Sequence, residues 1–351
     1  TQNNLGLAYS KRIRGERADN LEIAIQAFQN ALQVYTREAF PQDWAMTQNN
    51  LGNAYKNRIR GEKVDNLEIA IQAFQNALQV RTRQKFATAW AMTQNNLGNA
   101  YKNRIQGKRA DNLEIAIQAY QNTLQVLTRQ KSPSVWAMAQ NNLGLAYSNR
   151  IRGEKVDNLE QAIQAYQNAL QIYTCETFPN DWAMTQNNLG LTYSKRIRGE
   201  RADNLELAIQ AYQNALQVRT REAFPNDWAI TQNNLGLAYR KRIRGEKADN
   251  LEQAITAYQN ALQVYTREAF PNPWAMAQNN LGNAYKNRIR GERADNLEQA
   301  ITAYQNALQV LTHHRYPSTW TKIQNNLRLA HTHLSEIREL GVRSRELGVG
   351  R

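Results

Sequence analysis

An asparagine stands immediately before a leucine at eight positions spaced by 46 residues. A carboxamide carries two N–H donors and an acceptor oxygen, so it can pair with both the N–H and the C=O of an extended peptide. Eight such groups at one spacing would hold a peptide backbone while leaving specificity to flanking side chains. The positions are Asn4, Asn50, Asn96, Asn142, Asn188, Asn234, Asn280 and Asn326.

The same repetition suits a second role, in which each carboxamide ties one helix to its neighbour. We favour the peptide-binding role and keep the tie as the alternative. Each of these asparagines is preceded by another, such as Asn49, which is our second choice for contact with a ligand.

Three residues beyond each of these asparagines, the chain exchanges asparagine for leucine. A buried, unpaired carboxamide costs about 1–3 kcal/mol, so a core position would not tolerate this exchange easily. We therefore expect the position to line an open wall, with its leucines forming an apolar patch that docks a ligand side chain. The asparagines are Asn53, Asn99 and Asn283, and the patch is predicted to comprise Leu145, Leu191 and Leu237.

Cations follow one helical turn further on, and the formal net charge of the chain is +14. Such a balance favours acidic peptides, nucleic acid or an anionic membrane as partners, without choosing among them. The cations can attract an acidic ligand, or they can form a solvated face partly paired with Glu62, Asp65 and their equivalents. The predicted ligand-binding cations are Lys56, Lys102, Lys195, Arg240, Lys241 and Lys286, and the recurring Arg58 and Arg60 extend them into a basic rim.

No constellation typical of catalysis is present in the sequence. The histidines His331 and His333 are two residues apart on an expected helix and do not share a face, which disfavours a zinc site. The sequence has no glycine-rich dinucleotide motif, no phosphate-binding lysine loop and no serine elbow. We expect a protein that is not an enzyme and binds no metal or cofactor.

Residues 41–86 show the elements that must position these side chains. Pro41 and Asp43 suit the first turn of a helix. An apolar stripe follows at helical spacing and predicts a buried face; it consists of Trp44, Leu51, Tyr55 and Ile59. Gly61 is expected to end this helix as a left-handed cap.

A second helix is expected to begin at Asp65, with Glu68 completing a capping box. Its predicted buried face is Leu67, Ala70, Ile71, Phe74, Ala77 and Leu78. Because no alternating strand pattern occurs anywhere, the chain is predicted to be all-α. The tryptophans and tyrosines have the spacing of core residues rather than of a stacking platform.

The fixed period predicts a stack of seven units over residues 1–322. Counted from the Thr-Gln-Asn-Asn segment, the units are 1–46, 47–92, 93–138, 139–184, 185–230, 231–276 and 277–322. Residues 323–340 are expected to form a capping helix, and residues 341–351 a flexible tail.

The units resemble the tetratricopeptide repeat in Leu51-Gly52…Tyr55 and Ala70…Phe74…Ala77. The family's usual unit is 34 residues, and the longer unit here resembles the repeats of kinesin light chain and of arrays beside caspase-like CHAT proteases. The resemblance implies a right-handed α-solenoid superhelix whose inner wall is made of first helices and holds a peptide.

We therefore predict a protein-interaction scaffold for an acidic segment with an apolar anchor. Nucleic-acid binding through the basic rim and a sensor module of a larger, protease-like protein remain alternatives. The single cysteine, Cys175, favours a reducing, cytoplasmic setting. No stretch is apolar enough for a membrane span. The N-terminus reads as a cut from a longer protein, and the sequence leaves the ligand's identity and the oligomeric state open.

Overall fold

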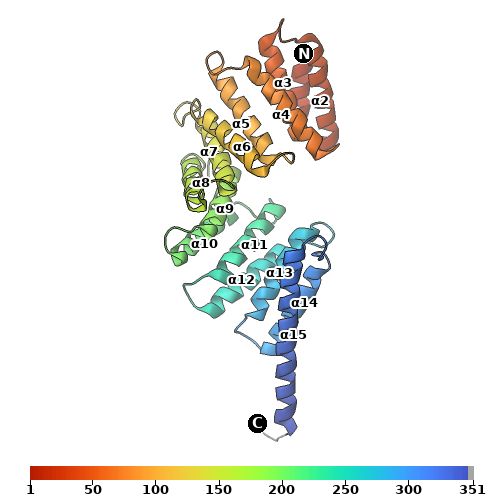
Figure 1. Ribbon diagram of the computed structural model, residues 1–351, viewed down its shortest axis with the longest axis vertical. Coiled ribbons are helices and arrows are strands. Elements are labelled where there is room, and N and C mark those ends of the chain that lie inside the picture. The colour runs from red at the N-terminus through yellow and green to blue at the C-terminus, as the bar shows by residue number, and fades with distance from the viewer. Residues whose placement is uncertain (347–351) are drawn as a thin grey trace. The chain divides into compact units, whose positions relative to one another are not determined.

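The computed structural model describes residues 1–346, with side chains for residues 1–340. This part of the chain forms fifteen α-helices and no strand, which confirms the all-α prediction (Figure 1). The helices form repeating pairs. The first helices are α1 (Gln2–Lys11), α3 (Pro41–Lys56), α5 (Ala87–Asn103), α7 (Pro133–Ser148), α9 (Pro179–Lys195), α11 (Pro225–Lys241) and α13 (Pro271–Lys286). The second helices are α2 (Arg17–Val34), α4 (Lys63–Val80), α6 (Arg109–Leu124), α8 (Lys155–Leu170), α10 (Arg201–Leu216), α12 (Lys247–Leu262) and α14 (Arg293–Leu308).

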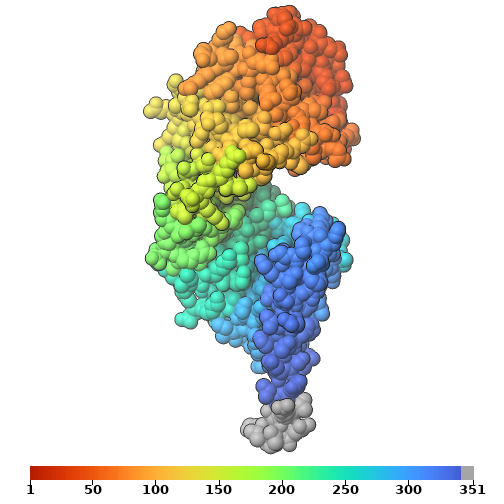
Figure 2. Space-filling view, viewed as in Figure 1, coloured from red at the N-terminus to blue at the C-terminus, as the bar shows by residue number. Residues whose placement is uncertain are grey.

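The chain divides into two compact units, a division that the sequence did not predict. Unit 1 is Thr1–Thr174 and contains α1 to α8. Unit 2 is Cys175–Arg351 and contains α9 to α14 and the last helix, α15 (Pro317–Glu346). Within unit 1, the bands of surface follow one another in chain order, from red through orange to yellow (Figure 2).

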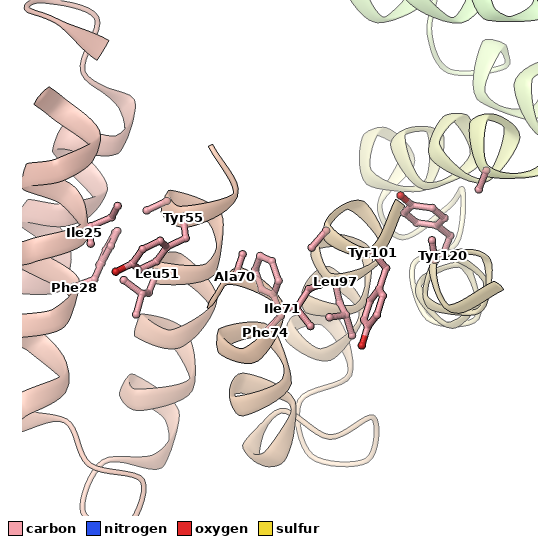
Figure 3. Close-up of a cluster of buried hydrophobic side chains, with 14 of the residues drawn as sticks. Ile25, Phe28, Leu51, Tyr55, Ala70, Ile71, Phe74, Leu97, Tyr101 and Tyr120 are labelled. Carbon is pink, nitrogen blue, oxygen red and sulfur yellow. The ribbon is translucent and has the colours of Figure 1, made fainter. Parts of the chain in front are cut away.

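The core of unit 1 runs continuously from one helix pair to the next. Leu51 and Tyr55 of α3 pack with Ile71 and Phe74 of α4, and the same cluster extends to α7 (Figure 3). These are the faces that the helical spacing predicted. The tryptophans are an exception, because Trp44 and its equivalents are only half-buried and lie beside the core rather than within it.

Glycine in each first helix allows an aromatic ring of the second helix to approach the backbone. A Cβ atom added at Gly52 would stand 2.7 Å from Cε1 of Phe74, closer than real Cβ contacts allow. The same relationship joins Gly98 to Tyr120. The glycine of the repeat is therefore required by packing between the two helices of one pair.

Three local predictions about the connection between the helices are wrong. Helix α3 ends at Lys56, so Ile59 lies in the loop and is 61% exposed instead of joining the buried stripe. Gly61 has the expected positive φ, +74°, but it lies in the loop rather than capping the helix. Helix α4 begins at Lys63 without a side-chain cap, so Asp65 lies in its first turn and forms no capping box.

The side chain of Asn66 closes this loop instead. Its Nδ2 donates to the carbonyl oxygen of Arg60 at 2.8 Å, and the bond recurs in the other pairs. A buried carboxamide thus fixes the extended residues that connect the two helices.

The predicted unit boundaries fall inside first helices, so they mark the register of the repeat rather than the ends of a helix pair. At the C-terminus, helix α15 spans Pro317–Glu346 and so is longer at both ends than the capping helix predicted for 323–340. Residues 341–346, predicted as tail, continue this helix, and residues 347–351 lie outside the described part of the chain.

Candidate binding wall

First helices of successive pairs lie closer together than second helices do. Within each unit, Cα atoms of neighbouring first helices, such as α3 and α5, approach within 8 Å. No such approach joins neighbouring second helices in the described residues. The first helices therefore form the inner row of each unit, and we call their exposed side the inner wall.

The predicted ladder asparagines lie on this wall, and all except the exposed Asn4 are half-buried. Nδ2 of Asn96 donates to Oδ1 of Asn49 in the preceding pair at 3.1 Å. The alternative that the sequence left open, a tie between helices, is therefore formed. The further ties are Asn50 to Asn3, Asn142 to Asn95, Asn234 to Asn187 and Asn280 to Asn233, while Asn188 is half-buried at the same register.

Each tie uses one N–H of the carboxamide, and the wall beside it is hollowed. A pocket of about 360 Å³ is formed by residues of α1, α2, α3 and α5. Asn50, Asn53 and Asn96 line it together with the apolar Leu7 and Met92. The structure thus brings three predicted site residues together in unit 1.

The position that alternates between asparagine and leucine is half-buried in every pair. At Asn99, the side-chain oxygen accepts a hydrogen bond of 2.9 Å from the buried hydroxyl of Tyr120. Asn283 accepts the equivalent bond from Tyr304 at 3.1 Å. Sequence reasoning missed these tyrosyl hydroxyls, because the spacing of the rings showed only that they belong to the core.

The leucines at this position are distributed over both units. Leu145 belongs to unit 1, whereas Leu191 and Leu237 lie on the adjacent helices α9 and α11 of unit 2. A patch formed by all three leucines stays a prediction. Leu191 and Leu237 are the two members of it that belong to the same unit.

Two half-buried lysines lie on the inner wall of unit 1 at the next helical turn. Lys56 Nζ donates to Oδ1 of Asn53 at 3.2 Å, and burial lowers its pKa. The pKa of Lys102 is lowered to about 8, chiefly by burial and further by the positive charges of Lys56 and Arg109. These lysines are held close to like charges and away from water. A bound anion would therefore offset the free-energy cost of burying their positive charges.

Unit 2 has a corresponding group of cations. Lys286 Nζ donates to Oδ1 of Asn326 at 2.8 Å, and burial, followed by the charges of Arg240 and Arg293, lowers the Lys286 pKa. Burial raises the pKa of Tyr258 to about 12, and the neighbouring Arg240 acts in the opposite direction. Nε of Arg240 and the hydroxyl of Tyr258 are both buried, and the two side chains are neighbours. The remaining predicted cations, Lys195 and Lys241, are exposed.

The rim arginines, in contrast, are paired with acids of the preceding helix pair. Arg58 donates through Nε and Nη2 to the two carboxylate oxygens of Glu22 at 2.8 and 2.7 Å, and Arg60 pairs with Asp19. The alternative of a paired, solvated face is thus the one that forms. However, the first rim arginine of each repeat pairs with the glutamate at the Glu68 position, and not with the one at the Glu62 position that the sequence suggested. The equivalent pairs include Arg104–Glu68, Arg150–Glu114, Arg242–Glu206 and Arg288–Glu252.

Within the described residues, no three His, Cys, Asp or Glu side chains are grouped so that they could hold a metal ion. Likewise, none of the helices within residues 1–346 combines the length and the apolar character that crossing a membrane requires.

The chain contains tetratricopeptide repeats. The family profile described as "Tetratricopeptide repeat" matches residues 182–222, 228–267 and 274–316, all within unit 2. The resemblance read from Leu51-Gly52…Tyr55 is thus confirmed at the level of the family, while the similarity to kinesin light chain and CHAT-associated arrays stays a prediction. None of the curated proteins compared with the chain matches it.

The chain also aligns over 95% of its length with solved structures, but its sequence identity to them is low. They include the APC/C hetero-tetramer Cut9–Hcn1, with 17% identity, 52% of that chain covered and a TM-score of 0.48. The TPR domain of P58(IPK) has 14% identity, 78% coverage and a TM-score of 0.33. A monomeric mutant of IFIT1 with m7Gppp-AAAA has 15% identity, 67% coverage and a TM-score of 0.42. The chain thus spans about half the length of the first of these.

Proposed function

We propose that the inner wall binds an extended segment of a partner protein that carries acidic side chains and an apolar anchor. The observation that carries this proposal is the pocket of about 360 Å³, which is lined by Asn50, Asn53 and Asn96. Carboxamides supply donors and acceptors to a peptide backbone, while Leu7 and Met92 supply apolar contact. Tetratricopeptide repeats typically act as interaction scaffolds, which agrees with this use.

The charge of the wall supports an acidic segment. Lys56 and Lys102 are half-buried without an acidic partner among the causes of their lowered pKa values. The rim arginines Arg58 and Arg60 already have carboxylate partners. Inner-wall cations therefore gain more from an incoming carboxylate than rim cations do, because a paired cation must first give up its partner.

The same contrast disfavours nucleic acid on the rim, which was the main alternative from the sequence. Nucleic-acid affinity depends on cations that can replace counterions along the phosphate backbone. Arginines already held by carboxylates, such as Arg150 and Arg242, are poor suppliers of that charge. A cytoplasmic location and a role as the sensor module of a larger protein stay predictions.

The test compares inner-wall and rim cations on a peptide array whose members share one length and vary in charge and in one leucine. The double substitution Lys56→Ser and Lys102→Ser removes two inner-wall cations. Serine is chosen because Ser10 and Ser148 stand at the same position in other repeats. Arg60→Gln is the matched control, because Gln106 stands at its position in another repeat. We expect the acidic, leucine-containing peptides to bind, the lysine double variant to weaken them about tenfold, and the control to leave them unchanged.

Equal binding of acidic and basic peptides, or equal loss in the inner and rim variants, would contradict the proposal. The apolar anchor is tested separately by Leu7→Asn, since Leu7 lines the pocket and Asn53 occupies that position in a sister repeat. The expected result is a selective loss of the leucine-containing peptides.

A further inference from the structure

Two arginines occupy a repeat position at which the other units carry tyrosine or leucine. Arg81 and Arg219 follow the second helices α4 and α10, where the sister residues are Tyr35, Leu127, Tyr173, Tyr265 and Leu311. Leu127 and Leu311 are 2% and 1% exposed, and Arg219 is 7% exposed. The position belongs to the edge of the core, so an arginine placed there loses much of its hydration.

Both arginines are anchored in the same way. Nη1 of Arg81 donates to Oγ1 of Thr93 at 3.0 Å, and Nη1 of Arg219 donates to Oγ1 of Thr231 at 3.1 Å. The two threonines are fully buried and occupy equivalent positions in α5 and α11. The two guanidinium groups are therefore held at equivalent places in the two units.

Only one of the two arginines has an acidic partner. Nη2 of Arg219 lies 3.7 Å from Oδ1 of Asp227, in the first turn of α11. The equivalent residue in the first turn of α5 is Ala89. Burial lowers the pKa of both arginines, and Asp227 opposes this effect for Arg219, whereas no carboxylate does so for Arg81. A cation held in a partly dry site without a counter-charge is costly.

A pocket of about 180 Å³ lies beside Arg81 and Ala89. Met46, Val80 and Phe86 supply apolar surface to it. Asp43 also lines the pocket, as its equivalent Asp181 lines the pocket of Arg219, and neither forms an ion pair with its arginine. The pocket thus combines one cation that forms no ion pair, apolar walls and a carboxylate that disfavours ligands with two negative charges.

We propose that this pocket binds the carboxylate of a small, apolar monocarboxylate ligand, with the guanidinium of Arg81 as its ionic partner. The bound carboxylate takes the part that Asp227 plays for Arg219 in unit 2. Met46 and Phe86 contact the apolar body of the ligand. This site lies at the beginning of α3 and α5, and its assignment does not depend on peptide binding by the inner wall.

The probe pair is 4-methylpentanoate and its neutral isostere, 4-methylpentanamide, titrated against the whole chain by calorimetry. The proposal predicts millimolar or tighter binding of the carboxylate and at least about tenfold weaker binding of the amide, because only the former pairs with the guanidinium. Equal affinity for both probes, or no binding of the carboxylate, would overturn it.

Two substitutions test whether the carboxylate binds at Arg81. Both introduce residues that sister repeats already carry at the same positions. Ala89→Asp gives Arg81 an internal partner, and Arg81→Tyr removes the cation. Each is expected to weaken 4-methylpentanoate at least about tenfold. The control, Arg219→Tyr, is expected to leave its affinity unchanged. Binding that survives both substitutions, or that is lost in the control, would place the carboxylate elsewhere and overturn the assignment.

Discussion

Arg58 of one helix pair and Glu22 of the preceding pair form a two-pronged ion pair, with Nε–Oε1 and Nη2–Oε2 distances of 2.8 and 2.7 Å. The arginine lies in the loop after the first helix, and the glutamate lies on the second helix of its neighbour. The guanidinium also stands 5.6 Å from the centre of the Tyr55 ring. Arginines that looked from the sequence like a ligand-binding rim therefore join successive repeats.

This relationship predicts a measurable loss of stability when one partner is neutralised. In the equivalent pair Arg104–Glu68, both side chains are only about a quarter exposed (25% and 28%). We expect Glu68→Gln to lower the free energy of unfolding by about 1–2 kcal/mol, because it leaves a half-buried guanidinium without its counter-charge. Urea denaturation measures the change.

The control is Arg152→Gln, which removes a pair that is more than half exposed on the arginine side. Exposed ion pairs contribute about 0–1 kcal/mol, so this variant should lie within roughly 0.5 kcal/mol of the parent. Equal losses in the two variants would show that the half-buried pair is not special.

The same ion pairs predict a loss of stability in acid. Hydrogen bonds from the arginines hold the pKa values of Glu22, Glu114, Glu206 and Glu252 below the ordinary value of 4.5. Because the folded-state pKa is the lower one, this stabilisation is fully present above pH 4.5 and is lost as the pH falls through the folded-state values. Chemical denaturation at a series of pH values from neutral downward measures the slope. Glu114→Gln with Glu206→Gln should flatten it, and an unchanged slope would assign acid unfolding to other carboxyl groups.

The contact between Gly52 and Phe74 predicts that alanine, normally the better helix former, destabilises the protein here. The added Cβ would meet Cε1 of Phe74 at 2.7 Å in a fully buried site. Overpacking of this kind typically costs about 1–3 kcal/mol, more than the gain of about 0.5–1 kcal/mol from helix propensity. Thermal unfolding of Gly52→Ala should show the loss, and Phe74→Leu in the same chain should recover part of it. A stabilised single variant would mean that the ring moves aside at no cost.

The fold was accessible from the sequence because its signals are local and are repeated seven times. Leu51 and Tyr55 on one helix and Ile71 and Phe74 on the next follow helical spacing, and all four are buried. The loop between them was assigned less well. Asp65 followed by Glu68 matches a capping box, yet the chain uses the neighbouring Asn66 to bind the carbonyl oxygen of Arg60. Asp65 and Asn66 are both of a residue type suited to the start of a helix, and only the path of the loop decides which of them makes the closing contact.

The candidate site was less accessible, because its decisive contacts join different repeats. The carboxamide of Asn96 is suited both to a peptide and to Asn49, and the distance of 3.1 Å to the latter depends on how two pairs stack. Likewise, Arg58 and Glu22 are 36 residues apart, and no local pattern links them. Composition gave the excess of positive charge but could not show which cations already have partners.

Lys102 gives the inner wall a pH dependence that separates it from the rim. Its pKa of about 8 lies below the ordinary value of 10.5, and burial, Lys56 and Arg109 are the causes. From about pH 8 to 10.5 the unfolded chain binds more protons at this residue, so its contribution to stability rises with pH. Below pH 8 the lysine is charged in both states and the folded protein bears the cost of its burial.

A bound carboxylate stabilises the charged form, so an acidic peptide on the wall should bind more weakly as the pH rises through about 8. An N-acetylated acidic peptide without cysteine or histidine has no group of its own that titrates in that range, so a slope that is lost on substitution of Lys102 is assigned to this residue. Lys102→Arg keeps the positive charge at every pH tested and should remove the pH dependence while preserving neutral-pH affinity. The test measures the affinity of one acidic peptide between about pH 7 and 9 by fluorescence anisotropy, for the parent protein and for Lys102→Arg. If the affinity depends on pH in the same way in both proteins, Lys102 does not contribute to the binding wall.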